Sequence, residues 1–305
     1  MPGTGTSRAW RRRSVVRHQG HTVLKAPVRV IVALALATGS MVATAVATSF
    51  PAAAAPTWAP AATATIHPGV QTFTSGGQCT ANFVYFDTAA TYIGQAAHCA
   101  GTGGNTATNG CTSGSLALGT PVTVTGASRP GTLVYSSWLT MQALHETDAN
   151  TCQFNDLALV KLDPADTGKV NPSIPHWGGP AGIATAGTTV GETVYSYGNS
   201  ELRGGVTVLS AKRGVSLGDS GAGWNHDVAT VSPGIPGDSG SAFLDANGNA
   251  LGVLSTLQLA PVAGSNGVGD VNLELQYLHG HTSFTGVQLA LGTVAFNGTQ
   301  LPLGP

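Results

Sequence analysis

Gly237-Asp238-Ser239-Gly240-Ser241 opens the stretch of the sequence that restricts the fold most strongly. An apolar run follows at once, then the turn Asp245-Ala246-Asn247-Gly248-Asn249, then a second apolar run. An Asn-Gly pair tolerates positive φ between β-prone runs, so this order predicts a β-hairpin. Glycine adopts backbone conformations barred to other residues, so Gly237 allows a tight turn before Ser239 and Gly240 allows close packing behind it.

Short β-prone runs recur along most of the chain, separated by turns rich in glycine. Their number and spacing predict an all-β sandwich or barrel. The run Val271–Leu278 alternates like a strand, but the Gly-Asp before it and the spacing of its apolar residues also allow a short C-terminal helix. The expected strands are Ala81–Phe86, Thr91–Ala96, Pro121–Thr125, Thr132–Ser136, Leu157–Leu162, Thr188–Ser196, Gly205–Ser210, Ser241–Leu244, Ala250–Thr256 and Val287–Phe296.

The beginning of the chain has the pattern of an export segment. Several arginines precede an uncharged run from Val30 to about Ala47, and small residues then crowd Ala52–Ala55. This predicts a secretory signal peptide over residues 1–54, with cleavage after Ala54 favoured over Ala47. A membrane anchor and a twin-arginine signal at Arg12-Arg13 are the alternatives. We therefore expect a secreted, extracellular protein with no membrane contact once this segment is removed.

Charge and cysteine content narrow the classes of partner. Only 9% of residues are charged and the formal net charge is −1, so nothing favours nucleic acid or an anionic membrane. An even set of cysteines in an exported chain predicts two disulfides, in any of three connectivities. These cysteines are Cys79, Cys99, Cys111 and Cys152. His279 and His281 could face the same way on a strand, but no third ligand is suitably spaced, so we expect neither a metal nor a cofactor.

Two further segments could supply the groups that activate a serine. A serine hydroxyl is a poor nucleophile until a base takes its proton and an acid orients that base. Ala96-Ala97-His98-Cys99 follows a β-prone run and offers His98 as the base. Asn155-Asp156 leads directly into another such run and offers Asp156 as the acid. Gly218-Asp219-Ser220-Gly221 repeats the serine motif, but no hairpin follows it, so we expect Ser220 in a surface turn.

These three segments resemble the signatures of chymotrypsin/trypsin-like serine endopeptidases, particularly their secreted bacterial branch. The order His98, Asp156, Ser239 is that family's order. The resemblance extends in outline over residues 69–296 and is specific only around the motifs. It implies two antiparallel six-stranded β-barrels with the active site in the cleft between them. A short Pro/Ala/Thr-rich segment (55–65) would precede an N-terminal barrel (66–165), a connection (166–182) and a C-terminal barrel (183–305).

The resemblance also implies a role for each matched residue. Ser239 would be the nucleophile, and the N–H groups of Gly237 and Ser239 would form the oxyanion hole. Ser255 falls where the family has a serine that contacts the triad aspartate. A disulfide between Cys79 and Cys99 is implied next to the catalytic histidine, which leaves Cys111 and Cys152 as the second pair.

The substrate pocket departs from the best-known pattern of the family. Pro233 stands where an enzyme that cleaves after Lys or Arg has Asp, so that specificity is not expected. Thr256 and Leu257 would form the pocket wall, and Leu257 replaces a usual glycine, which favours small or medium apolar side chains. Asp238 needs a cationic partner, for which Arg203 and Arg213 are the candidates.

These expectations together describe a secreted serine endopeptidase that hydrolyses peptide bonds with a Ser-His-Asp triad, through an acyl-enzyme. It would act on protein or peptide substrates, without a cofactor and as a monomer. A catalytically silent binding protein and an esterase on the same scaffold are the alternatives, since a fold does not dictate an activity.

Overall fold

The computed structural model describes residues 54–104 and 107–302 of the chain. They belong to one structural unit, Phe50–Pro305. The expected signal peptide, residues 1–54, thus lies almost wholly outside the described residues. No helix in the described part is long and apolar enough to cross a membrane.

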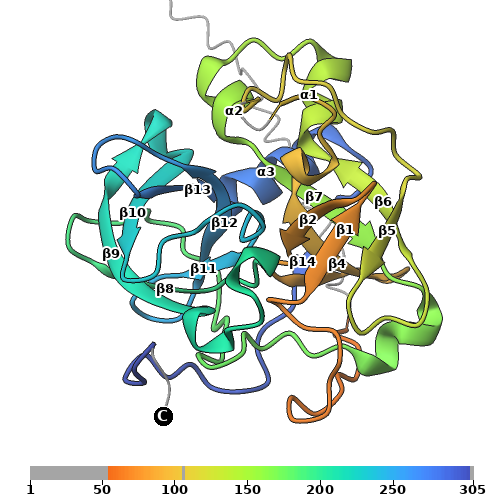
Figure 1. Cartoon of the computed structure of the whole chain (residues 1–305). Coiled ribbons are helices and arrows are strands. Elements are labelled where there is room, and N and C mark those ends of the chain that lie inside the picture. Colours follow the sequence, from red (N-terminus) through yellow and green to blue (C-terminus); the bar gives the residue numbers. More distant parts are fainter. Residues whose placement is uncertain (1–53, 105–106, 303–305) are drawn as a thin grey trace, which may run out of the picture. The chain divides into compact units, whose positions relative to one another are not determined.

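The N-terminal half forms one antiparallel sheet of eight strands in the order β14-β3-β4-β7-β6-β5-β1-β2 (Figure 1). Its last strand in the sequence comes from the C-terminal end of the chain and pairs with β3. The strands are β1 (Gln71–Thr74), β2 (Gly77–Thr80), β3 (Val84–Phe86), β4 (Thr91–Ala96), β5 (Pro121–Val124), β6 (Gly131–Ser136), β7 (Leu157–Lys161) and β14 (Gln288–Leu289).

This sheet curls back on itself at the bend between β2 and β3. Ala81 donates its N–H to Val70 O (2.8 Å), and Asn82 donates to Gly94 O (2.9 Å), which joins the β1 side to the β4 side. β2 and β3 therefore act as one bent strand in a ring with β4, β7, β6, β5 and β1. The hydrogen-bonded ladder is interrupted at the bend, whereas the expectation was a regular six-stranded barrel.

The C-terminal half closes into a barrel with the strand order β10-β13-β12-β11-β8-β9. The all-β, two-barrel fold is thereby confirmed, while the domain boundaries expected from the sequence stay predictions. The strands are β8 (Thr193–Tyr197), β9 (Ala211–Ser220), β10 (Asn225–Thr230), β11 (Ala242–Leu244), β12 (Ala250–Leu257) and β13 (Asn266–Asp270). The hairpin expected around Asn247-Gly248 is β11–β12, with Gly248 at a φ of +80°.

Three segments differ from the expected strands. Residues 205–210 contain the 3-10 helix η4 (Thr207–Leu209), and only Gln288–Leu289 of the run 287–296 pairs as a strand. Val271–Leu278 belongs to helix α3 (Val271–His281), the alternative that its spacing allowed. Asp270 caps α3 by accepting the Leu273 N–H at 2.7 Å, which explains why the helix starts there.

Two helices between β6 and β7 were not expected from the sequence. They are α1 (Ser137–Leu144) and α2 (Ala149–Phe154), and Figure 1 shows them at one end of the N-terminal sheet. Asp148 caps α2 by accepting the Thr151 N–H at 2.8 Å. Both helices are short, so no apolar periodicity long enough to reveal them exists. The remaining 3-10 helices are η1 (Ala97–Ala100), η2 (Pro164–Lys169), η3 (Glu201–Arg203) and η5 (Gly221–Gly223).

Candidate active site

A cleft of about 770 Å³ receives side chains from both barrels. His98 and Asp156 reach it from the N-terminal half, and Ser239 and Ser255 reach it from the C-terminal half. The structure therefore brings together the residues that the three sequence motifs singled out.

Strand pairing places His98 beside Asp156. β4 and β7 pair with Ala96 opposite Leu157, so the residues that follow β4 and precede β7 are neighbours. Asp156 Oδ2 lies 2.6 Å from His98 Nδ1, and Asp156 Oδ1 accepts the His98 backbone N–H at 2.8 Å. One carboxylate thus holds both the ring and the backbone of the histidine, which fixes the ring orientation and favours the tautomer with its proton on Nδ1.

Asp156 receives a third hydrogen bond from the opposite barrel. Ser255 Oγ donates to Asp156 Oδ2 at 2.6 Å, the contact that the resemblance implied. Asp156 itself is only 2% exposed. A buried carboxylate that is fully hydrogen-bonded is a stable partner for an imidazolium.

The electrostatics of this pair predict the acid limb of activity. Burial lowers the pKa of His98, but the Asp156 charge and hydrogen bond more than offset this, so the pKa of His98 lies above its usual 6.5. A general base must be neutral, so kcat/KM should rise as pH increases through this raised pKa. The measurement is kcat/KM on a peptide between pH 5 and 9 (about two units on either side of neutrality). An acid limb centred below 6.5 would contradict this account of the pair.

The turn around Ser239 is shaped by glycines and backbone hydrogen bonds. Ser239 O accepts the Thr80 N–H at 2.8 Å, and Gly240 N donates to Leu254 O at 2.7 Å. Gly240 has a φ of +86°, and a Cβ there would lie 2.6 Å from Thr80 O, so only glycine fits. No hydrogen bond among the described residues joins Ser239 Oγ to His98. Such contacts commonly tighten only when substrate binds.

Two backbone N–H groups beside Ser239 lack partners. The N–H groups of Asp238, Gly240 and Ser241 all donate to backbone carbonyls, whereas those of Gly237 and Ser239 have no acceptor among the described residues. Both residues line the cleft. Two unpaired donors next to a candidate nucleophile are what stabilisation of an oxyanion requires.

The peptide groups before Ser239 are held by donors from the neighbouring elements. Gly237 O accepts hydrogen bonds from Gln78 Nε2 (2.9 Å) and Thr80 Oγ1 (2.8 Å). Pro236 O accepts one from Ser200 Oγ at 2.6 Å. These carbonyls therefore accept hydrogen bonds from side chains and not from the two unpaired N–H groups. The side-chain hydrogen bonds hold the turn in one conformation.

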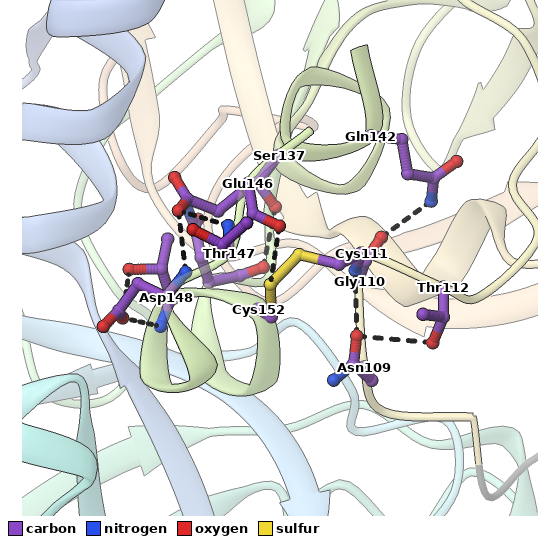
Figure 2. The surroundings of a disulfide bond; sticks show 12 residues. Asn109, Gly110, Cys111, Thr112, Ser137, Gln142, Glu146, Thr147, Asp148 and Cys152 are labelled. Carbon is purple, nitrogen blue, oxygen red and sulfur yellow. Dashed lines mark hydrogen bonds between the residues drawn. A yellow bond between two sulfur atoms is a disulfide. The ribbon is translucent and has the colours of Figure 1, made fainter. Parts of the chain in front are cut away.

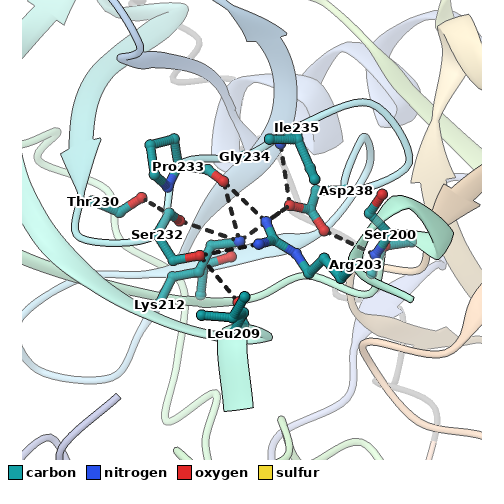
Figure 3. A network of polar contacts seen from close by, with 12 residues as sticks. Ser200, Arg203, Leu209, Lys212, Thr230, Ser232, Pro233, Gly234, Ile235 and Asp238 are labelled. Atoms are coloured by element: carbon teal, nitrogen blue, oxygen red, sulfur yellow. Dashed lines mark hydrogen bonds and ion pairs between the residues drawn. The ribbon is translucent and has the colours of Figure 1, made fainter. Parts of the chain in front are cut away.

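Asp238 is fully buried and binds two cations (Figure 3). Arg203 Nη2 lies 2.5 Å from its Oδ2, and Lys212 Nζ lies 3.1 Å from the same atom. Of the two candidates named from the sequence, Arg203 is a partner, whereas the Arg213 guanidinium lies 5.8 Å from the centre of the Tyr195 ring. Lys212 was missed, because its position on β9 gives no local signal of a partner that lies 26 residues later in the sequence.

The same two cations hold the segment before the serine turn. Lys212 Nζ donates to Ser232 O (3.2 Å), and Arg203 Nη2 donates to Pro233 O (3.0 Å). Burial lowers the pKa of Lys212, while the Asp238 charge opposes that shift. Figure 3 shows both side chains converging on Asp238 from one side of this segment.

The lining of the cleft carries little charge. Thr256 and Leu257 line it as expected, but Pro233 does not, and its neighbour Gly234 does. Asn266 accepts the Gly234 N–H at 2.8 Å, so its amide is already engaged. Apart from Asp156, no Asp, Glu, Lys or Arg lines the cleft in the described part of the chain. Leu257 is 56% exposed, which places it at the rim and leaves the pocket open.

Two disulfides brace the walls of the cleft. Cys79–Cys99 joins β2 to η1 beside His98, and Cys111–Cys152 joins the loop after η1 to α2. These are the pairs that the resemblance implied. Figure 2 shows the second bridge, where Gly110 O near Cys111 accepts a hydrogen bond from Gln142 Nε2 of α1 at 2.7 Å. The bridge ties α2, and the Gln142 hydrogen bond ties α1, to the loop that follows the candidate base.

The remaining histidine and serine candidates lie elsewhere. His279 and His281 are on α3, and each has a ring nitrogen at a backbone carbonyl, Val287 O and Tyr277 O. Ser220 ends β9, where its Oγ accepts from Asn225 Nδ2, and it does not line the cleft. Cys79, His98 and Cys99 lie close enough for a metal, but both cysteines are in the disulfide and offer no thiolate.

Comparison with known proteins gives distant structural likenesses only. No protein-family model and no curated protein matches the chain. Thermobifida fusca protease A is similar over 74% of this chain and 99% of its own, with 18% identity and a TM-score of 0.47. A glutamic acid-specific serine protease that uses a histidine triad in substrate binding is similar over 74% of this chain and 100% of its own. Its identity is 20% and its TM-score is 0.46. Cellulomonas bogoriensis chymotrypsin is similar over 74% of this chain and 98% of its own, with 18% identity and a TM-score of 0.45. At these values the likenesses carry no weight for activity.

Proposed function

We propose that this protein is a secreted serine endopeptidase that hydrolyses peptide bonds through an acyl-enzyme. The observation that carries the proposal is the joint presence, in one cleft, of the buried Asp156–His98 pair and two unpaired N–H groups at Ser239. A base with its orienting acid activates a hydroxyl, and the two donors stabilise the negative charge that develops on the substrate oxygen.

In this reaction His98 and Ser239 each act in two ways, and Asp156 and Gly237 each act in one. His98 takes the proton of Ser239 Oγ as that oxygen attacks the substrate carbonyl carbon, and Asp156 stabilises the imidazolium. The Gly237 and Ser239 N–H groups bind the oxyanion of the tetrahedral intermediate. His98 then protonates the leaving amine, and water repeats the sequence to release the acid. No cofactor enters these steps, and we expect the enzyme to act as a monomer.

Export is part of the proposal for two reasons. The first residues have the pattern of a signal peptide, and the two disulfides suit an oxidising compartment. A cleft lining with little charge favours substrates with a neutral side chain before the scissile bond, because burying an unpaired charge there is costly.

A diverse peptide library tests the function and the specificity together. Purified protein should cut internal bonds after small or medium apolar residues, with cleavage after Lys, Arg, Asp or Glu at least about tenfold slower. Mass spectrometry of the products identifies each cut. A matched peptide amide and ester separate the alternatives, since an esterase turns over only the ester and a silent binding protein turns over neither.

A further inference from the structure

The second Gly-Asp-Ser-Gly segment leads from the surface into a hydrogen-bonded network, since the side chain of Asp219 is 26% exposed. Its Asp219 accepts from His226 Nδ1 at 2.7 Å, and the other ring nitrogen of His226 lies 3.0 Å from Asp270 Oδ2. His226 is fully buried on β10. Burial lowers the pKa of His226, but the two carboxylates more than offset this and raise it. The histidine therefore bridges β9 to the start of α3.

One turn into α3 stands a carboxyl group that reaches the candidate triad. Glu274 Oε1 accepts the backbone N–H of Asp156 at 2.9 Å, across 118 residues of sequence. Glu274 is fully buried. A Cβ at Gly269 would lie 2.8 Å from this oxygen, so glycine on β13 makes room for the carboxyl group.

This carboxyl group has no compensating cation. No Lys, Arg or His in the described residues pairs with Glu274, and its Oε2 has no hydrogen-bond partner. The titratable groups that face it are Asp156, Asp270, Tyr85 and Tyr135. Burial raises the pKa of Glu274 well above its usual value, the Asp156 N–H opposes this, and the charges of Asp156 and Asp270 add to it.

We propose that Glu274 is a positioning residue for Asp156, held as a neutral carboxylic acid whose oxygen fixes the Asp156 peptide. The Asp219–His226–Asp270 bridge sets where α3 begins and hence where Glu274 lies. A neutral acid pins the peptide without placing a second negative charge behind Asp156. This role rests on the proposed function, since it matters only if Asp156 orients His98.

Two substitutions distinguish a Glu274 that positions Asp156 from a Glu274 that only fills space. Glu274→Gln keeps the shape and the acceptor, so kcat should stay within about twofold and the acid limb of kcat/KM should not move. Glu274→Ala removes the acceptor, so kcat should fall about 10- to 100-fold with KM nearly unchanged, and the limb should move to lower pH. Gln276→Ala, at an exposed position of the same helix, is the control.

Three results would overturn the role. In one, Glu274→Ala keeps its kcat. In another, Glu274→Gln loses as much activity as Glu274→Ala. In the third, Glu274→Gln lowers the pH of the acid limb, which would show that Glu274 carries a charge that His98 senses.

Thermal unfolding tests the neutral acid without any activity. The unfolded chain loses the Glu274 proton near pH 4.5, while the folded protein keeps it, so this group makes folding less favourable as pH rises above that value. The difference in Tm between Glu274→Gln and the unmodified protein should therefore increase as the pH is raised from about 5 to about 8. A constant or falling difference contradicts a neutral Glu274.

The two failures can be told apart. If a fluorophosphonate does not label Ser239 in the unmodified protein, the proposed function fails, while the Tm comparison still reports on Glu274. If it does react and Glu274→Ala keeps full kcat, only the role of Glu274 fails.

Discussion

Replacing Ser239 by alanine should lower kcat/KM on a peptide substrate by about 10⁴- to 10⁶-fold, to the residual rate that the oxyanion donors alone support. Ser239 lines the described cleft together with His98, and its own N–H is one of the two unpaired donors, so its hydroxyl is the group that we propose forms the acyl-enzyme. The measurement is steady-state kinetics on the best peptide from the library.

The chain provides its own matched control for this substitution. Ser220 stands in the same Gly-Asp-Ser-Gly sequence but outside the cleft. Ser220→Ala should keep kcat/KM within about twofold. A large loss of kcat/KM in Ser220→Ala, or full activity in Ser239→Ala, would show that the hairpin after Ser239 does not mark the nucleophile.

Lys212→Met should lower kcat by about 10²- to 10³-fold with little change in KM, as the loss of an oxyanion donor does. Lys212 and Asp238 are both fully buried, and Lys212 also holds the Ser232 carbonyl. Without the lysine, Asp238 keeps Arg203 as its one cation among the described residues, together with the N–H groups of Ser200 and Ile235. None of these three lies on β9, so the turn that presents the Gly237 and Ser239 N–H groups loses its anchor on that strand.

The same substitution should also reduce stability. Breaking a buried pair leaves a charge without full compensation, and because Arg203 remains, the loss should be roughly 1 to 3 kcal/mol. Arg213→Met removes a cation from the next residue of β9 and should leave kcat unchanged. Denaturant unfolding and steady-state kinetics of the two variants check this. Equal kcat values for both variants would contradict the positioning of the oxyanion donors by Lys212.

A local pattern was sufficient for the hairpin, whereas the meeting of residues in the cleft was predicted only through the family resemblance. Asn247-Gly248 between apolar runs is a local signal, and it correctly predicted β11–β12 after Ser239. The resemblance implied that His98 and Asp156 meet. Their meeting follows from the pairing of β4 with β7, which no local pattern encodes.

Features that depend on distant contacts were not predictable. Helices α1 and α2 are too short for periodicity, and a disulfide and packing hold them. The run Gly205–Ser210 has β-prone residues, yet it contains the 3-10 helix η4 and pairs with no strand in the described part of the chain. Lys212 and Glu274 are ordinary charged residues in the sequence, and only the folded chain shows what they contact.

Covalent labelling with a fluorophosphonate, mapped by mass spectrometry, is the most direct test of Ser239 as the nucleophile. We expect one adduct, on Ser239, in the unmodified protein and in Ser220→Ala, and none in Ser239→Ala. Labelling should also be lost in His98→Ala, which lacks the base. An unlabelled native protein, or an adduct that persists in Ser239→Ala, would contradict the assignment of Ser239 as the nucleophile.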